Sequence, residues 1–190
     1  MTFTETPLQG AFIVTMESSY DERGSFGRAF SAREFREHGL DSELTEISIS
    51  RNLRDRTLRG MHYQQSPYEE AKLVRVIRGT AFDVAVDIRP ASPTYLKWVG
   101  VELTAENQLA FYIPKGFAHG FLTLEENTDI LYQISDTYHG ASATGFAWND
   151  PSVEISWPKL PTIISSGDAA MPNLTRRGFQ GEVDLYEPVV

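Results

Sequence analysis

Short stretches in which apolar and polar residues alternate, separated by turn-forming residues, recur along most of this chain. The clearest is TAFDVAVDIRP at residues 80–90, where every second residue from Phe82 to Ile88 is apolar and Asp83 and Asp87 fall on the other face. This two-residue period is typical of a β-strand. Further strands are predicted over residues 7–15, 44–50, 95–103, 109–114, 117–124 and 129–135. Many short strands between turns predict an all-β sandwich or barrel of jelly-roll type.

Helices are expected to be few and short. The clearest is SAREFREHG at residues 31–39, because Ser31 can cap its first turn, Glu34 lies three residues on, and Gly39 ends it. Residues 21–30 (DERGSFGRAF) predict a turn followed by an extended run. The C-terminal tail has room for one short helix.

The chain shows no alternation of strands and helices, no internal repeat and no linker. We therefore predict one domain over residues 1–190, with a core at about 8–158 and a tail, 159–190, partly packed on the barrel. The absence of cysteine excludes disulfides and thiolate chemistry. Neither a bilayer-spanning apolar run nor a secretory signal is visible, so we expect a cytoplasmic protein that is not inserted in a membrane.

Residues 58–78 (LRGMHYQQSPYEEAKLVRVIR) are the most informative stretch. They predict two strands paired as a hairpin around Pro67, and a similar pair is predicted for 117–124 and 129–135. Polar residues stand among the apolar ones of the first pair, namely Arg59, His62, Gln64, Glu70 and Lys72. Since polar groups on a buried face are costly without a partner or ligand, we expect the functional site here, together with His119.

Strand geometry sets one condition on this site. Arg59 and His62 are three residues apart, so on a regular strand their side chains point to opposite faces. Both can reach one pocket only if the strand twists or bulges near Gly60.

The net charge of −9 argues against a nucleic-acid partner. Positive charge nevertheless gathers between residues 51 and 78, at Arg51, Arg54, Arg56, Arg59, Lys72, Arg75 and Arg78. Such a cluster suits a small anion such as a diphosphate. Arg59 and Lys72 are the better candidates because apolar residues surround them, whereas Arg54, Arg56 and Arg75 are expected to lie in solvent.

The spacing of Pro114, Gly116 and His119, together with His62 and Glu70, resembles the two-part signature of cupins. Cupin metal sites have a second histidine two residues after the first, and that position here is Gln64. His62, Glu70 and His119 remain as a possible facial triad. With one ligand missing we expect no metal and no other cofactor, and a metal-dependent oxygenase is the outside alternative.

Six blocks then follow one another in order between residues 21 and 168: LRGMHYQ, EAKLVRVIRG, DVAVDIRPASPTY, IPKGFAHGF, LYQISDTY and WNDPSVEISWP. In these the chain resembles the dTDP-4-dehydrorhamnose 3,5-epimerase family. The resemblance implies a metal-free cupin jelly roll, a nucleotide-diphosphate 4-keto sugar as substrate, and a homodimer. It also implies that the enzyme inverts carbons beside the ketone.

Inverting such a carbon needs a base, an acid on the opposite side of the sugar ring, and a group that holds the enolate. The resemblance implies His62 as the base, Asp168 as the carboxylate that orients it, and Tyr132 as the acid. It implies Lys72 as the group that stabilises the enolate oxygen. Further residues implied to bind substrate are Arg23, Phe26, Arg28, Glu46, Ser48, Arg59, Asp83, His119 and Tyr138.

The departures from the family pattern fall on the binding residues. The family usually has glutamate where this chain has Arg28, glutamine where it has Glu46, and asparagine where it has Ser48. In a later loop the family has glutamate at the position of Ala143, and before the final aspartate it has lysine at the position of Gly167. These changes predict altered recognition of the nucleotide or sugar, so dTDP, CDP and GDP all remain open, as does action at C3, C5 or both.

Other interpretations also remain open. A 3,4-ketoisomerase and a sugar-binding cupin of the same fold are alternatives. Keeping Tyr132 disfavours the ketoisomerase, and keeping His62, Tyr132, Lys72 and Asp168 together disfavours a protein that only binds sugar. Without the ordered blocks, His62 would be read as a core histidine, Tyr132 as a strand aromatic, and Asp83 and Asp87 as solvent-facing residues. No chemical role is expected for His38 and His139.

Overall fold

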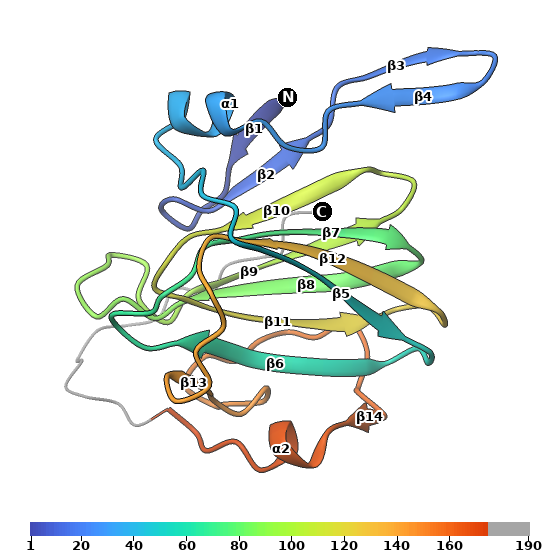
Figure 1. Ribbon diagram of the computed structural model, residues 1–190. Coiled ribbons are helices and arrows are strands. Elements are labelled where there is room, and N and C mark those ends of the chain that lie inside the picture. Colours follow the sequence, from blue (N-terminus) through green and yellow to red (C-terminus); the bar gives the residue numbers. More distant parts are fainter. Residues whose placement is uncertain (175–190) are drawn as a thin grey trace.

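Two sheets, antiparallel except for one short parallel pair, face each other in the computed structural model, which describes residues 1–174 (Figure 1). Sheet I has the order β1 (Thr2–Glu5), β2 (Phe12–Thr15), β10 (Leu109–Ile113), β7 (Lys72–Arg78), β12 (Thr128–Ile134), β5 (Glu46–Asn52). Sheet II has the order β13 (Ala143–Gly145), β6 (Thr57–Gln64), β11 (Phe117–Thr123), β8 (Thr80–Asp87), β9 (Trp98–Thr104), and β14 (Ile163–Ile164) pairs with β6. A hairpin of β3 (Ser18–Asp21) and β4 (Gly24–Gly27) and the helices α1 (Ala32–Glu37) and α2 (Ser166–Ala169) complete the fold. The predicted all-β sandwich with few helices is confirmed.

Residues 58–78 were predicted to form one hairpin, and residues 117–124 and 129–135 a second. Both predicted strand pairings are wrong. β6 lies in sheet II and β7 in sheet I, and the same separation holds for β11 and β12. The loops after β6 and after β11 carry the chain from one sheet to the other, as jelly-roll connections do. Polar residues of β6 and β7 therefore face each other across the sandwich instead of lying side by side on one hairpin.

The first predicted strand, 7–15, is also corrected. Residues 6–11 form a turn between β1 and β2, in which the Thr6 hydroxyl donates to the Ala11 carbonyl (3.0 Å) and Gly10 has a φ of +91°. Polar side chains that bond to nearby backbone favour turns, and Gly takes a positive φ without strain.

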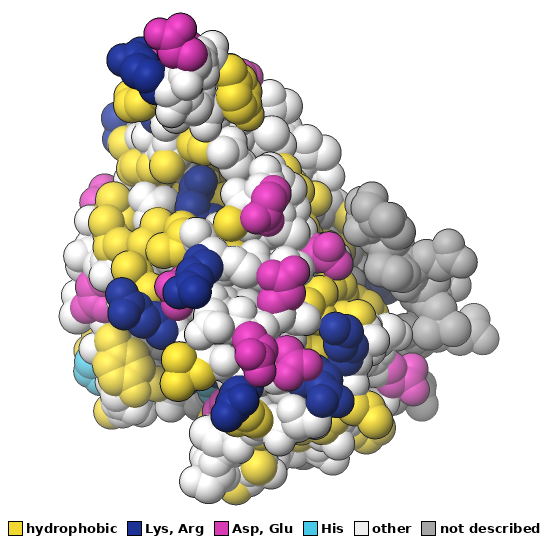
Figure 2. Space-filling model, turned by 90° about the vertical axis from the view of Figure 1, so that its right-hand side faces the viewer, with side chains coloured by type: hydrophobic (Ala, Val, Ile, Leu, Met, Phe, Trp, Pro, Cys, Tyr) yellow, Lys and Arg dark blue, Asp and Glu magenta, His cyan; other side chains and the backbone are white. Residues whose placement is uncertain are grey.

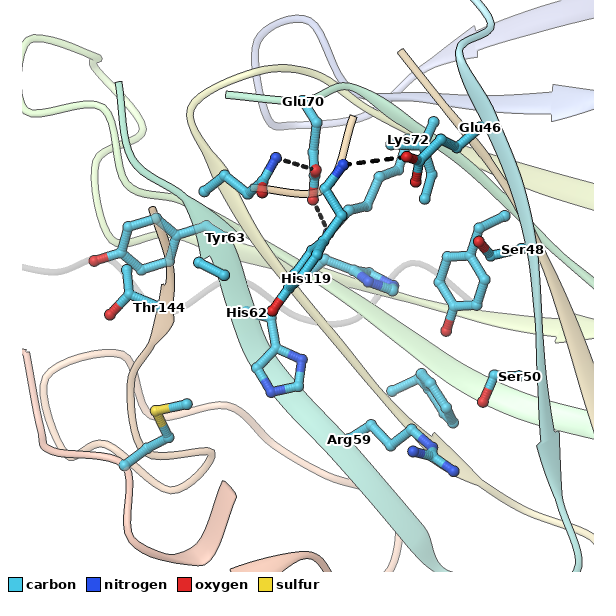
Figure 3. Close-up of a pocket in the computed structure, with 17 residues that line it drawn as sticks. Glu46, Ser48, Ser50, Arg59, His62, Tyr63, Glu70, Lys72, His119 and Thr144 are labelled. Carbon is cyan, nitrogen blue, oxygen red and sulfur yellow. Dashed lines mark hydrogen bonds and ion pairs between the residues drawn. The ribbon is translucent and has the colours of Figure 1, made fainter. Parts of the chain in front are cut away.

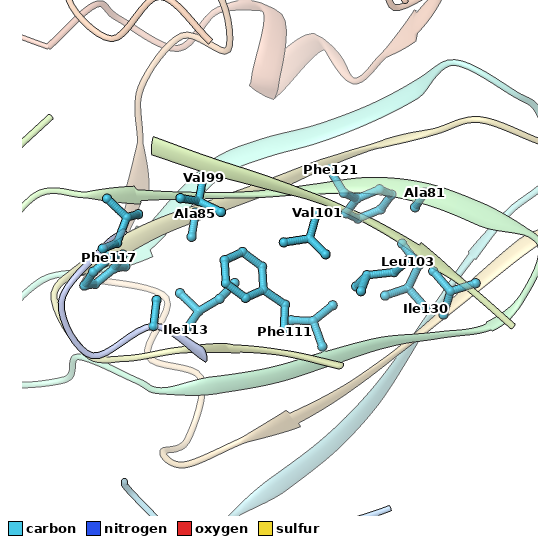
Figure 4. Close-up of a cluster of buried hydrophobic side chains, with 14 residues drawn as sticks. Ala81, Ala85, Val99, Val101, Leu103, Phe111, Ile113, Phe117, Phe121 and Ile130 are labelled. Atoms are coloured by element: carbon cyan, nitrogen blue, oxygen red, sulfur yellow. The ribbon is translucent and has the colours of Figure 1, made fainter. Parts of the chain in front are cut away.

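The core between the sheets consists of interdigitated aliphatic and aromatic side chains (Figure 4). Phe111, Leu103 and Val74 are completely buried there. Both faces of β8 are covered, because its outer face packs under the segment that includes Phe146 and Trp157. Asp83 and Asp87 lie on the inner face and are 0 % exposed, so the solvent-facing interpretation of both is wrong.

Helix α1 forms as predicted. The Ser31 hydroxyl accepts a hydrogen bond from the Glu34 backbone N–H (3.4 Å), and Phe35 is buried against the rings of Phe3, Phe30 and Tyr112. One buried aromatic residue fixes this short helix on sheet I, and a six-residue helix needs such packing because it has few hydrogen bonds of its own.

Arg75 was expected in solvent, and that expectation is wrong. Its side chain is buried and donates from Nη2 to the Ala29 carbonyl (2.6 Å), and burial lowers its pKa. Arg54 is exposed as expected, whereas Arg56 is half-buried. Arg75 therefore ties the segment that follows the β3–β4 hairpin to the outer face of sheet I.

The β3–β4 hairpin projects away from the sandwich, and Figure 2 shows hydrophobic side chains gathered below it. Its large side chains are unburied, with Tyr20 74 % and Phe26 83 % exposed. Apolar and polar residues alternate along β5 as predicted, but Ile47 and Ile49 point outward and are 61 % and 53 % exposed. The apolar face of this strand therefore lies outside the core of its own chain.

The C-terminal tail is described as far as residue 174, and the rest of the predicted tail, 175–190, lies outside the described residues. Within the described part, β14 pairs with β6, and α2 is the short helix that the tail was expected to hold. No helix of residues 1–174 is long and apolar enough to span a bilayer.

Tyr112 provides a stability test of this packing. Its hydroxyl accepts from the Asp41 N–H (2.9 Å), and burial raises its pKa from 10 to about 12. Between these values the unfolded chain loses the proton and the folded chain keeps it, so stability falls as pH rises. We expect Tyr112 to contribute a loss of about 1.4 kcal/mol per pH unit there, seen as a difference in urea denaturation between wild type and Tyr112→Phe. Equal slopes for the two proteins from pH 10 to 12 would contradict this.

Candidate active site

A cavity of about 540 Å³ opens between the two sheets (Figure 3). Its walls come from β5 and β12 of sheet I, β6 and β11 of sheet II, and the start of β7. The loop around Tyr138 and Met171 of the tail add to the walls. The cavity gathers the polar residues that the sequence places on separate strands.

A bulge in β6 brings Arg59 and His62 to this cavity. His119 pairs with His62 but Phe121 pairs with Arg59, so β6 has one residue more than β11 over this interval. Gly60 stands at the bulge with a φ of +123°, and a Cβ there would lie 2.5 Å from the Cα of Gly120. The condition set by strand parity is thus met, and only glycine fits the bulge.

His62 is joined to Asp168. Its Nε2 lies 2.7 Å from Asp168 Oδ1, and the His62 side chain is 43 % exposed toward the cavity while the Asp168 side chain is 10 % exposed. Asp168 is in turn held by its place in α2, where its N–H donates to the Ser165 hydroxyl (3.0 Å). Because a carboxylate only accepts, His62 Nε2 carries the ring proton and Nδ1 has a free lone pair.

Tyr132 lies in the opposite sheet, on β12. Its ring and the ring of His119 form a T-shaped pair with a centroid distance of 5.8 Å and an angle of 76°, and His119 Nε2 bonds to Asp83 Oδ1 (2.8 Å). Burial and then the charge of Asp83 raise the pKa of Tyr132 well above 10, although Arg59 lowers it. Tyr132 therefore stays protonated at neutral pH and can donate a proton.

Lys72 reaches the cavity from the start of β7. Its Nζ lies 2.9 Å from Glu70 Oε1, and each of the two side chains is 11 % exposed. A cation, a base with a free lone pair and a protonated phenol thus line one cavity from three strands.

A family model described as dTDP-4-dehydrorhamnose 3,5-epimerase matches residues 5–176 of this chain. The chain belongs to the dTDP-4-dehydrorhamnose 3,5-epimerase family. The relative from Methanothermobacter thermautotrophicus that carries this name is 44 % identical over 156 residues, which are 82 % of this chain and 83 % of the relative. The resemblance seen in the sequence is confirmed.

Two solved structures of similar proteins extend this comparison. The dTDP-6-deoxy-D-glucose-3,5-epimerase of Legionella pneumophila, in complex with dTDP-4-keto-L-rhamnose, has a TM-score of 0.86 and 40 % identity, covering 90 % of this chain and 92 % of that one. A 3′-monoepimerase from Streptomyces bikiniensis, in complex with dTDP-quinovose, has a TM-score of 0.83 and 29 % identity, covering 90 % and 86 %. The cupin-type jelly roll expected for an epimerase of this family is therefore the fold of this chain.

Arg59 of this epimerase-family chain has a partner that the sequence did not reveal. Its Nε donates to Asn52 Oδ1 (3.0 Å), and the buried Asn52 amide donates to the carbonyl of Thr128 (3.1 Å). Asn52 stands at the end of a strand, where no sequence signal distinguishes it from a turn residue. The guanidinium is thereby directed along the cavity wall with its remaining donors free for a ligand.

Glu46, Ser48 and Tyr138 line the cavity, as expected for binding residues. The Glu46 carboxylate accepts from the Tyr138 N–H (3.3 Å), and the Tyr138 side chain stays exposed. Sequence reasoning missed Ser50, Tyr63, Thr144 and Met171, which also line the cavity. Ser50 shares the parity of Glu46 and Ser48, so the alternation of β5 could have identified it.

Arg23, Phe26 and Arg28 are not brought to this cavity. They lie on or beside the projecting hairpin, where Arg23 pairs with Asp21 and Arg28 lies 3.4 Å from Glu34. Phe26 and Arg28 line a separate surface hollow. Their predicted binding role thus has no support within one chain.

The possible metal triad is not assembled either. Within residues 1–174, no three acidic or histidine side chains converge as a metal site. His62 bonds to Asp168, His119 to Asp83, and Glu70 to Lys72. Each of the three candidate ligands is directed to a different partner.

Proposed function

We propose that this chain epimerises nucleotide-diphospho-4-keto-6-deoxyhexoses in deoxysugar biosynthesis, as a dTDP-4-dehydrorhamnose 3,5-epimerase. The observation that carries the proposal is the placement of His62 on sheet II, paired with Asp168 of α2, and of a protonated tyrosine on sheet I, with both rings facing one cavity. A base and an acid on opposite walls are what inversion at carbon requires.

The first step is removal of a proton from a carbon beside the C4 ketone. His62 accepts it at Nδ1, and the resulting imidazolium is stabilised by Asp168 at 2.7 Å. The electron pair of the broken C–H bond moves to the C4 oxygen as an enolate. Lys72 donates a charge-assisted hydrogen bond to that oxygen, which lowers the barrier because the charge develops only as the bond breaks.

The second step returns a proton from the other side. Tyr132 donates its phenolic proton to the carbon, the enolate returns to a ketone, and the configuration is inverted. The phenolate then regains a proton from solvent, and His62 releases one. C3 and C5 both adjoin C4, so the same groups can act on both carbons if the sugar ring turns between the two reactions and each carbon in turn lies between His62 and Tyr132.

A C3-only epimerase is the second candidate, because a 3′-monoepimerase has the same fold at a TM-score of 0.83. The two activities differ in whether the sugar turns so that C5 also meets His62 and Tyr132. Ring reorientation depends on the binding residues, and those are where this chain departs from the family pattern, at Glu46 and Ser48.

The substrate is a nucleotide sugar, with dTDP as the first nucleotide to test. Arg59 and Lys72 are the cavity cations that suit a diphosphate and an enolate oxygen, respectively. Comparing kcat/KM for dTDP-, CDP- and GDP-linked 4-keto-6-deoxyglucose tests this, and a preference for dTDP of tenfold or more is expected. A preference for CDP or GDP would assign the departures at Glu46 and Ser48 to nucleotide recognition, and turnover of none would contradict the function.

The chain is also proposed to work as a homodimer. Ile47 and Ile49 leave an apolar strip on the outer face of β5, and Ile77 on β7 is 46 % exposed. The hairpin beside this face carries Phe26 and Arg23 without a place for them in their own chain. Burying that face against a second copy would let each hairpin reach the partner's cavity.

Ile49→Glu is therefore expected to convert the protein to monomers and to lower turnover at least tenfold, because a buried unpaired carboxylate is costly at an interface. Light scattering after size-exclusion chromatography measures the mass. Leu160→Glu is the matched control, since Leu160 belongs to the tail and is 78 % exposed. An unchanged dimer in Ile49→Glu, or a wild-type monomer, would contradict this arrangement.

A further inference from the structure

The Lys72 ammonium group is largely buried and therefore needs a polar partner. Lys72 shares the inner face of β7 with Val74 and Val76, which belong to the core between the sheets. Its side chain is 11 % exposed. A lysine head group in such surroundings is costly without a partner, and its flexible four-carbon stem allows several directions.

Glu70 is the partner, and both of its carboxylate oxygens are in use. Oε1 meets Lys72 Nζ at 2.9 Å, and Oε2 accepts from Gln64 Nε2 at 2.6 Å. Gln64 comes from β6 of sheet II and is 5 % exposed. A chain of polar contacts therefore crosses the cavity wall from one sheet to the other and ends on the lysine.

Gln64 cannot turn its amide freely. Its Oε1 accepts from the His139 backbone N–H (2.5 Å), and its Nε2 also donates to the Tyr68 carbonyl (2.9 Å). The NH₂ group is thus fixed toward Glu70, and the carboxylate is fixed toward Lys72. Gln64 and Glu70 stand where a metal-binding cupin would place two ligands, and here they are joined to each other and to an ammonium group.

We propose that Glu70, held by Gln64, is a positioning residue that directs the Lys72 ammonium at the C4 oxygen of the substrate. The proposal rests on the proposed function, in which Lys72 stabilises the enolate. Glu70 takes one of the three ammonium hydrogens and leaves the others for the cavity. It also prevents Lys72 from turning to Glu46, the other carboxylate that lines the cavity.

Glu70→Gln tests this with almost no change of shape. An amide at this position must turn its own NH₂ either to the Lys72 ammonium or to the fixed NH₂ of Gln64, so one contact becomes donor against donor. We expect kcat to fall roughly 10- to 100-fold with KM within about threefold, because Lys72 acts mainly on the transition state. Glu70→Asp keeps the negative charge on a side chain that is one methylene group shorter. We expect it to recover part of the kcat that Glu70→Gln loses.

Two controls separate positioning from a general loss of structure. Glu69→Gln removes the neighbouring carboxylate, which does not line the cavity, and is expected to leave kcat unchanged. In a Lys72→Ala background, Glu70→Gln is expected to add less than threefold, because a residue that acts through Lys72 has nothing left to act on. If the double variant instead lost kcat by the product of the losses of Lys72→Ala and Glu70→Gln, the proposal would be overturned.

A measurement without turnover keeps the proposal separate from the function. The ammonium ¹H–¹⁵N signal of Lys72, assigned with Lys72→Ala, is expected in wild type and Glu69→Gln and is expected to be lost in Glu70→Gln. Retention of that signal, or a kcat in folded Glu70→Gln equal to that of Glu69→Gln, would overturn the proposal. Failure of wild type to turn over any 4-keto sugar would instead refute the function, while the signal still reports whether Glu70 holds Lys72.

Discussion

Replacing His62 by alanine is expected to lower epimerisation of a dTDP-linked 4-keto sugar by about 1,000-fold, within the range of a general base. The methyl group of alanine cannot accept the proton from carbon, and no other base with a free lone pair is placed beside Asp168. Binding should change little, because Arg59 and Lys72 remain in the cavity. Initial rates from coupled reduction of the product measure the loss.

Matched variants show whether the loss belongs to the base. Asp168→Asn keeps the size of the side chain but removes the charge behind the imidazolium, so a loss of about 100-fold is expected, at the low end for such a group. His38→Ala removes a histidine at the end of α1 and is expected to leave the rate unchanged. A His62→Ala protein that is folded and within tenfold of wild type would contradict the assignment.

Tyr132→Phe is expected to separate removal of the proton from carbon, which His62 performs, from return of a proton to the opposite side of the ring. In the wild type the two steps occur together. Without its hydroxyl group, proton return from sheet I is lost, and inverted product should form roughly 100- to 1,000-fold more slowly. His62 can still remove the proton and return one from solvent to the same side. Exchange of that hydrogen with D₂O should therefore continue within about tenfold of the wild-type rate, without inversion.

Tyr68→Phe serves as the control for this variant, because Tyr68 lies outside the cavity and stacks on His139 through its ring. The stacking survives loss of the hydroxyl group, so both rates should equal those of wild type. If Tyr132→Phe loses exchange and inversion together, the hydroxyl group acts before or during proton removal, and the two-wall mechanism is wrong.

The fold could be predicted from local pattern because the strands are short and alternate. The alternation in residues 80–90 and the cap at Ser31 correspond to β8 and α1. Strand pairing was wrong where the chain crosses between sheets, since alternation identifies a strand but carries no information about its partner. The burial of Arg75 also escaped prediction, because its acceptor, the Ala29 carbonyl, comes from a distant segment.

The site could be predicted from the ordered blocks, which include His62, Lys72 and Tyr132 in one family pattern. Spacing alone gives no contact between His62 and Asp168, which are 106 residues apart and meet only because α2 lies under β6. The Asn52 contact with Arg59 depends in the same way on how β5 lies beside the bulge. Contacts of this kind are therefore found from the structure, whereas the candidate residues themselves, including Asp168, could be named from the family pattern.

The most direct test follows dTDP-4-keto-6-deoxyglucose by NMR in D₂O with the protein present. The account predicts that the C3 and C5 proton signals both disappear, that the inverted product forms, and that His62→Ala abolishes both changes. Loss of the C3 signal alone would identify the C3-only epimerase. Persistence of both signals with wild-type protein, or exchange equally fast with His62→Ala, would contradict the central claim that His62 removes these protons.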